Sequence, residues 1–121
     1  MNQPSFSPSI SGGLASNQEL ANLFEEYLND ARTILLKKLQ AEEKNCMASN
    51  NDNPDNYAKC MYAFQKDMKD HISNLNFRTT FLKRKMEECM ESTIYRTNKE
   101  EGTKHCIKSA KVIIEKLIKS I

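Results

Sequence analysis

The chain contains little of what builds β-sheets and tight turns. Its 121 residues include no tryptophan, only three glycines and only three prolines, while 28% of the residues are charged. The composition is rich in good helix formers and poor in strand formers, which predicts an all-α fold. The length is that of one domain, whose apolar core we expect to be thin.

Long apolar runs and a strong net charge are also missing. No run approaches the roughly 20 apolar residues that cross a bilayer, so we expect no transmembrane segment. The stretch from Met1 to Ala15 has neither the basic and apolar regions of a secretory signal nor the arginine of an amphipathic transit peptide. The formal charge is +2 and the basic residues are not interleaved with aromatics, which argues against nucleic-acid binding.

Motifs for catalysis and metal binding are lacking as well. The sequence has no Gly-rich phosphate loop, no nucleophile elbow and no HExxH helix. Adjacent acidic residues such as Glu42 and Glu43 diverge on a helix, so we expect them to be solvated. There is no CxxC motif, and the two histidines are His71 and His105. We therefore expect no enzymatic activity, no cofactor and no metal site.

What the chain does have is three amphipathic segments with apolar residues spaced three and four apart, a pattern that predicts helices. A capping box, Ser-Asn-Gln-Glu at residues 16–19, starts the first helix. The Asn- and Asp-rich run at residues 50–55 ends the first helix, and a turn within residues 97–102 separates the second from the third. The predicted helices span residues 16–48, 54–96 and 102–120.

Residues 73–80 of the second helix carry Ser, Asn and Thr side chains that favour local backbone bonding over helix. The apolar stripe stays in phase across them, so we expect one continuous helix, with a break there as the alternative. Short connections make successive helices antiparallel, which predicts three long helices running up, down and up. Residues 16–121 then form a single helical domain, and residues 1–15 a flexible arm with Phe6, Ile10 and Leu14 as apolar anchors.

The cysteines form two pairs, each symmetric about a predicted turn. The first pair lies seven residues on either side of Asn53, and the second is equally distant from the midpoint of Thr97 and Asn98. In antiparallel helices the members of such a pair stand at the same height, so we expect each pair to close a helical hairpin as a disulfide. Each closed loop stabilises the fold by about 3 kcal/mol in the chain-entropy model. The four residues are Cys46, Cys60, Cys89 and Cys106.

Two alternatives stay open for these cysteines. A nested pairing, Cys46 with Cys106 and Cys60 with Cys89, requires a chain reversal that only residues 73–80 offer. Alternatively, all four are free thiols in a reducing cytosol and act as small buried apolar side chains. Disulfides instead indicate an oxidising compartment.

Paired cysteines that bracket a helical hairpin on a short chain resemble the coiled-coil-helix-coiled-coil-helix and small Tim proteins of the mitochondrial intermembrane space. The resemblance covers residues 46–60 and 89–106. In those families each helix carries two cysteines, whereas the outer partners of Cys89 and Cys106 would fall here at Lys85 and Ala110. The resemblance implies import without a presequence, trapping by oxidation, and a place in the intermembrane space at the inner membrane; the cytoplasm is the alternative.

From these features we expect a non-catalytic accessory subunit of a larger inner-membrane assembly of the respiratory-chain type. Its partners would be other protein subunits, bound on the intermembrane-space side. A small Tim-like import chaperone and a cytosolic or cytoskeletal helical adaptor with reduced cysteines are the alternatives. We expect the lysines of the last helix to be a solvated face that complements the helix dipole, with a peripheral contact to acidic lipid as the alternative. The basic residues of that helix are Lys104, Lys108, Lys111, Lys116 and Lys119.

Overall fold

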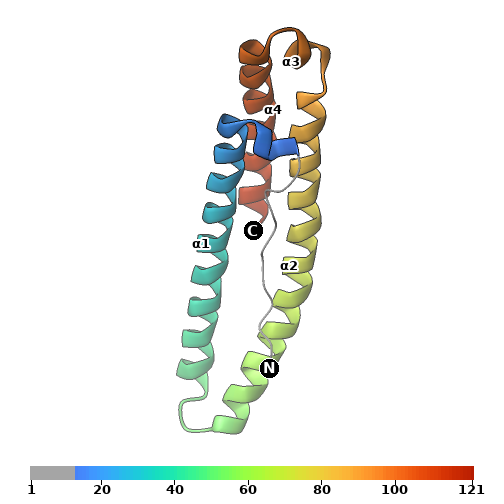
Figure 1. The fold of residues 1–121 in the computed structure, drawn as a ribbon. Coiled ribbons are helices and arrows are strands. Elements are labelled where there is room, and N and C mark those ends of the chain that lie inside the picture. The colour runs from blue at the N-terminus through green and yellow to red at the C-terminus, as the bar shows by residue number, and fades with distance from the viewer. Residues whose placement is uncertain (1–12) are drawn as a thin grey trace.

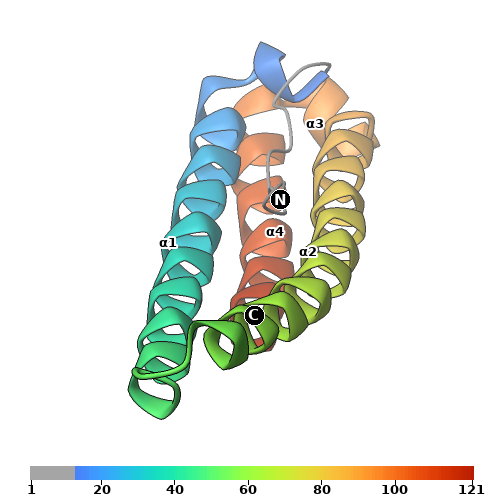
Figure 2. The same ribbon diagram turned by 90° about the horizontal axis from the view of Figure 1, so that it is seen from below.

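The computed structural model describes residues 13–121, and all regular structure in that range is helical (Figure 1). Three long helices run antiparallel in succession, as the sequence predicts; in the view of Figure 1 they run down, up and down (Figures 1 and 2). Residues 1–12, which make up most of the predicted arm and include Phe6 and Ile10, lie outside the described residues. The elements are the 3-10 helix η1 (Gly13–Ser16) and the α-helices α1 (Gln18–Ser49), α2 (Pro54–Met90), α3 (Thr93–Thr97) and α4 (Lys99–Ser120).

The long helices differ in length, and this difference shapes the molecule. α1 has 32 residues and α2 has 37, whereas α4 has only 22. α4 packs against both longer helices and ends about half-way along them (Figure 1). At its end, Lys38 of α1 donates a hydrogen bond to the backbone oxygen of Ile121, and Arg78 of α2 donates one to Ser120 Oγ at 2.8 Å. Beyond that level α1 and α2 continue as a pair.

The apolar core lies where all three long helices are present. Within it, the hydroxyl groups of Tyr27 and Thr79 are 2.7 Å apart and hydrogen-bonded, so the one threonine in the stripe of α2 has a polar partner. None of the described helices is both long enough and apolar enough to cross a bilayer. The other buried side chains of the core are Leu14, Leu20, Phe24, Leu28, Ala31, Leu35, Ile72, Leu75, Leu82, Met86, Cys106, Ala110, Leu117 and Ile121.

The first described turn corrects the prediction that the arm extends to Ala15. Residues 13–16 form η1, and Leu14 is fully buried against the bundle. Leu14 is therefore part of the core, because its side chain covers the end of the helices where α1 begins. α1 starts at residue 18 rather than 16, since Asn17 caps it by accepting a hydrogen bond from the Leu20 N–H at 3.2 Å. Ser16 does not cap the helix; its hydroxyl group donates a hydrogen bond to the Gly13 carbonyl oxygen.

The end of the second predicted helix also needs correction. α2 is continuous through residues 73–80, as expected, but it ends at Met90 rather than at residue 96. The physical reason is Ser92, whose Oγ accepts a hydrogen bond from the Tyr95 N–H at 3.4 Å and so caps a separate short helix, α3. The side chain competes with the helical backbone and lets the chain turn toward α4.

The third predicted helix starts three residues earlier than expected, at Lys99. Its cap is Asn98, which accepts a hydrogen bond from the Glu101 N–H at 3.2 Å. Gly102, which we predicted to mark the turn, lies inside α4 instead. A Cβ atom there would come within 2.8 Å of Tyr95 Cβ, so the glycine is required by the close approach of α3 to α4.

Both predicted hairpins are closed by disulfides. Cys46–Cys60 joins α1 to α2 with a Cα–Cα distance of 5.8 Å, and Cys89–Cys106 joins α2 to α4 with one of 5.7 Å. The nested pairing is wrong, because Cys60 and Cys89 lie 29 residues apart on one continuous helix. At a rise of 1.5 Å per residue they are separated by about 44 Å.

Candidate functional site

The end of α4 divides the described chain into two parts. We call residues 13–38 and 72–121 the three-helix half, and residues 39–71 the two-helix half. Cys46 is the only buried residue of the two-helix half, and every other buried residue of the described chain belongs to the three-helix half. The two-helix half therefore has almost no core of its own.

A groove between α1 and α2 continues beyond the end of α4, where no third helix of the described chain covers it. We call this hollow the open groove. Its apolar floor includes Phe64 and Met68, which are one helical turn apart and only half-buried. Lys38, which bonds the end of α4, lines the groove at its upper edge, so the groove begins where α4 stops. The lining residues are Lys38, Ala41, Glu42, Phe64, Asp67, Met68 and His71.

His71 stands between the open groove and the end of α4. It also lines an adjacent hollow beside Arg78 and Ser120. Its Nε2 atom is buried and has no hydrogen-bond partner among the described residues. Leaving a buried polar atom without a hydrogen bond costs about 1–3 kcal/mol. A polar group of a bound partner that formed a hydrogen bond with Nε2 would remove this cost and so favour binding.

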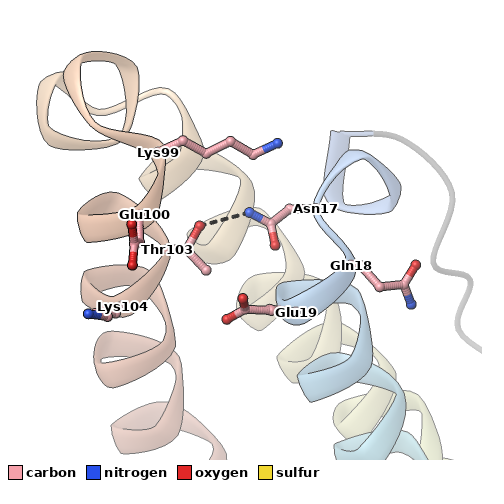
Figure 3. Close-up of a pocket in the computed structure, with 7 residues that line it drawn as sticks. All are labelled: Asn17, Gln18, Glu19, Lys99, Glu100, Thr103 and Lys104. Carbon is pink, nitrogen blue, oxygen red and sulfur yellow. Dashed lines mark hydrogen bonds between the residues drawn. The ribbon is translucent and has the colours of Figure 1, made fainter.

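A second hollow lies at the opposite end of the bundle, where α1 and α4 begin (Figure 3). Asn17 lines this hollow, and only 5% of its surface is exposed. Its side-chain amide donates hydrogen bonds to Thr103 Oγ1 at 2.9 Å and to Tyr95 OH at 3.0 Å, while its oxygen caps α1. Asn17 therefore ties α1, α3 and α4 together, and its hydrogen-bonding capacity is used within the fold.

The rim of this second hollow carries charges of both signs. Figure 3 shows Lys99 extended toward the Asn17 side, with Glu19 and Lys104 on the two walls. The acidic Glu19 and Glu100 oppose the attraction of an anion to the two helix N-termini. We interpret this hollow as a structural junction and the open groove as the candidate functional site.

Large apolar side chains are also exposed outside the groove. Phe77 and Phe81 are one turn apart on the outer face of α2, with 78% and 52% of their surfaces exposed. The Lys85 ammonium lies over the Phe81 ring, 5.6 Å from its centroid. Within residues 13–121, the other exposed large apolar residues are Leu36, Met47, Tyr62, Ile94 and Val112.

The five lysines of the alternative lipid contact all lie exposed on α4, which also contains Lys99 as its first residue. At 3.6 residues per turn they fall within an arc of about 140°. Two of them are paired on this face, Lys104 with Glu101 at 3.8 Å and Lys119 with Glu115 at 3.2 Å. Of these five lysines, Lys108, Lys111 and Lys116 lie outside the ion pairs of the described residues.

The predicted site residues lie at opposite ends of the molecule. Cys46 and Cys60 close the free end of the two-helix half, and Cys89 and Cys106 close the end that holds α3. The open groove was not predicted from the sequence, because the apolar stripe of α2 does not show how far along α2 a third helix packs against it. The lengths of the predicted helices could have indicated the groove, since the third predicted helix is far shorter than the second and cannot cover all of it.

Comparison of the chain with protein-family models, with curated proteins and with solved structures found no match. The function is therefore inferred from the chain's own geometry.

Proposed function

We propose that the chain is a non-catalytic accessory subunit that docks onto a larger protein assembly by receiving a partner's helix in the open groove. One observation carries this proposal: the groove that α4 fills in the three-helix half continues past the end of α4, between residues 38–42 of α1 and 64–71 of α2, where no other described helix covers it. An amphipathic helix laid in a groove is a common mode of recognition between proteins.

α4 itself indicates what such a helix would look like. The residues that α4 buries are small or aliphatic, and from Thr103 onward they recur at intervals of three, four and seven. A partner helix following α4 end to end would need the same spacing, with short apolar side chains over Phe64 and Met68. A hydrogen-bonding group near its first turn would reach His71 Nε2, which has no partner in the described structure.

The charges that line the open groove do not strongly favour a partner of either sign. The groove lining contains Lys38 and Glu42 from α1 and Asp67 from α2, so its charges are mixed. Specificity would then come from the shape of the apolar floor and from the hydrogen bond at His71.

The proposal also includes the cellular compartment in which the protein acts. Both hairpins are closed by disulfides, a feature of oxidising compartments. Together with the resemblance described above, this supports an accessory subunit on the intermembrane-space side of a mitochondrial inner-membrane assembly, of the respiratory-chain type. A small Tim-like chaperone, or a cytosolic adaptor with reduced cysteines, would be recognised by the outcomes below.

The test is co-migration of the tagged full chain with a high-mass assembly on native gels of its own cells. Phe64→Glu places a charge on the groove floor and should abolish co-migration. Phe77→Glu is the matched control, because Phe77 is an exposed phenylalanine of the same helix that lies outside the groove. Retention by Phe64→Glu, or loss with Phe77→Glu alone, would refute docking in the groove.

Two further measurements separate the alternatives. A discrete hexamer of the purified protein on gel filtration would favour the chaperone. Alkylation without reductant, followed by mass spectrometry, should leave the native chain unlabelled at all four cysteines. Four labels per chain would favour the cytosolic adaptor.

A contact with acidic lipid is a second candidate, favoured by the clustering of five exposed lysines on one face of α4. Co-sedimentation with anionic vesicles at low salt should be lost when Lys108, Lys111 and Lys116 are replaced by glutamine, and should be unaffected when Lys59, Lys66 and Lys69 of α2 are replaced. Equal binding of both variants would refute this contact.

A further inference from the structure

Three side chains with metal-ligating atoms converge at the free end of the two-helix half. The Glu42 carboxylate and the sulfur atoms of Cys46 and Cys60 all lie within 4.8 Å of one another. Glu42 precedes Cys46 by one helical turn on α1, so both side chains face α2, which supplies Cys60. In the part of the chain that the structure describes, the Cys89–Cys106 disulfide has no third His, Cys, Asp or Glu at such a distance.

We propose that these three residues form a zinc site when the Cys46–Cys60 disulfide is reduced. Zinc binds cysteine thiolates and carboxylates in tetrahedral geometry. With Zn–S bonds of about 2.3 Å and a Zn–O bond of about 2.0 Å, neighbouring ligand atoms stand about 3.5–3.8 Å apart. The sulfur atoms must separate from their covalent distance to reach this spacing, whereas a carboxylate oxygen of Glu42 lies within 4.8 Å of both of them.

The environment suits an ion with one open position. Cys46 is buried, whereas Glu42 and Cys60 are half-buried, and Glu42 also lines the open groove. Three protein ligands would leave the fourth tetrahedral position to a water molecule from the groove. The two thiolates and the carboxylate together carry three negative charges, which the dication offsets in large part.

The chemistry balances with a thiol reductant. A dithiol attacks the half-buried Cys60 sulfur as its thiolate, the Cys60–Cys46 bond breaks, and Cys46 leaves as a thiolate. The second thiol of the reductant then displaces Cys60, so the dithiol becomes a disulfide and the chain gains two thiols. Binding of one Zn²⁺ by both thiolates releases the two thiol protons. α1 and α2 are then joined at the same height by the metal instead of by the covalent bond.

The experiment uses the full chain, reduced by a water-soluble phosphine that is itself oxidised to its phosphine oxide with oxygen taken from water. After anaerobic removal of the phosphine, Co²⁺ is titrated as a spectroscopic probe and then displaced with Zn²⁺. One Co²⁺ per chain should bind with the charge-transfer absorption of cobalt–thiolate bonds, and Zn²⁺ should remove that absorption. The oxidised chain should give no such absorption.

Three variants locate the site. Glu42→Gln should weaken cobalt binding at least about tenfold, since loss of a ligand should cost no less than loss of an outer hydrogen bond to one. Glu43→Gln, the exposed neighbour outside the cluster, is the matched control and should bind as the native chain does. Cys46→Ser with Cys60→Ser should abolish the absorption although Cys89 and Cys106 remain.

Circular dichroism of each reduced chain reports whether the helices persist. If reduction frays the two-helix half, zinc should restore its helicity in the native chain and in Glu43→Gln, but not in Glu42→Gln at the same concentration. The absence of a one-to-one complex, whether or not the reduced chain is helical, would overturn the proposal. Equal affinity of the two glutamate variants, or binding that survives loss of Cys46 and Cys60, would overturn it as well.

Discussion

The three-helix half and the two-helix half are built from the same two helices, yet they are stabilised differently. In α2, Phe64 and Met68 follow the same apolar stripe as Ile72 and Leu82, but the first two are half-buried and the last two are buried. The difference is α4, which covers one stretch of the groove and leaves the other open. A matching stripe on two helices is therefore not enough to form a core in this molecule; a third helix is needed.

The two halves also use their disulfides differently. Cys89–Cys106 closes a hairpin that already has a core, and Cys46–Cys60 closes one that has almost none. The loops have similar lengths, with sequence separations of 17 and 14, so the chain-entropy contribution of each bond is similar, about 3 kcal/mol. The difference is the packing that remains once the disulfide is removed: a core in the three-helix half and almost none in the two-helix half.

The largest contrast is expected for two matched phenylalanines. Phe24→Ala removes a fully buried ring from the three-helix half and should lower the free energy of unfolding by about 3–5 kcal/mol. Phe64→Ala removes a half-buried ring from the two-helix half and should cost about 1 kcal/mol or less. Urea denaturation of both variants measures the difference, and equal losses would contradict the division into two halves.

Removal of the disulfides should affect different parts of the chain. Cys89→Ser with Cys106→Ser should lower the free energy of global unfolding by about 3 kcal/mol. Cys46→Ser with Cys60→Ser should instead accelerate amide exchange within residues 39–71 and leave exchange in the three-helix half nearly unchanged. A global loss of protection in the second variant would show that the halves unfold as one unit.

Two asparagine caps provide a smaller contrast. Asn17→Ala removes a helix cap and also leaves Thr103 Oγ1 and Tyr95 OH without their donor, so we expect a loss of about 1–3 kcal/mol. Asn53 caps α2 in the exposed turn of the two-helix half through one bond, from the Asn56 N–H at 3.1 Å. Asn53→Ala should cost about 0.5–1 kcal/mol. Thermal unfolding of the two variants would show the order.

The smallest effect concerns Tyr27 and alkaline pH. Burial raises the pKa of Tyr27 above its ordinary value of 10.0, against the smaller opposing effect of its hydrogen bond with Thr79. The unfolded chain therefore loses this proton at lower pH than the folded chain does. The stability linked to neutral Tyr27 is complete below about pH 10 and is lost as the pH rises from there toward the folded pKa.

Tyr27→Phe tests this linkage. The variant should be about 1 kcal/mol less stable at neutral pH, because Thr79 Oγ1 loses its partner. It should also show a shallower decline in stability above pH 10 than the native chain. Tyr62→Phe, on the exposed outer surface of the two-helix half, should leave the stability at neutral pH unchanged. Parallel declines in Tyr27→Phe and the native chain would contradict the assignment.

The helical hairpins and their disulfides could be predicted from sequence because both depend on spacing along the chain. Cysteines equidistant from a turn must stand level in antiparallel helices, whatever else surrounds them. The junction at α3 could not be predicted in the same way. Its form depends on Gly102 allowing Tyr95 to approach α4 and on Asn17 bonding Tyr95 and Thr103, and these contacts join residues up to 86 positions apart.

The open groove could not be predicted from the sequence for a related reason. A half-buried methionine and a buried leucine have the same place in an apolar stripe, so the stripe alone does not reveal whether a third helix covers it. Leu14 shows the converse, since a single apolar residue in a stretch without periodicity is fully buried. Both outcomes are decided by which elements meet in space.

Residue-resolved amide hydrogen exchange of the native, oxidised chain tests the central claim most directly. We predict that amides within residues 39–71 exchange by local opening, with protection far below that of the three-helix half. Amides near Phe24, Leu82 and Ala110 should exchange only through global unfolding. Uniform protection along the whole of α1 and α2 would contradict the claim that the bundle is complete in one half and open in the other.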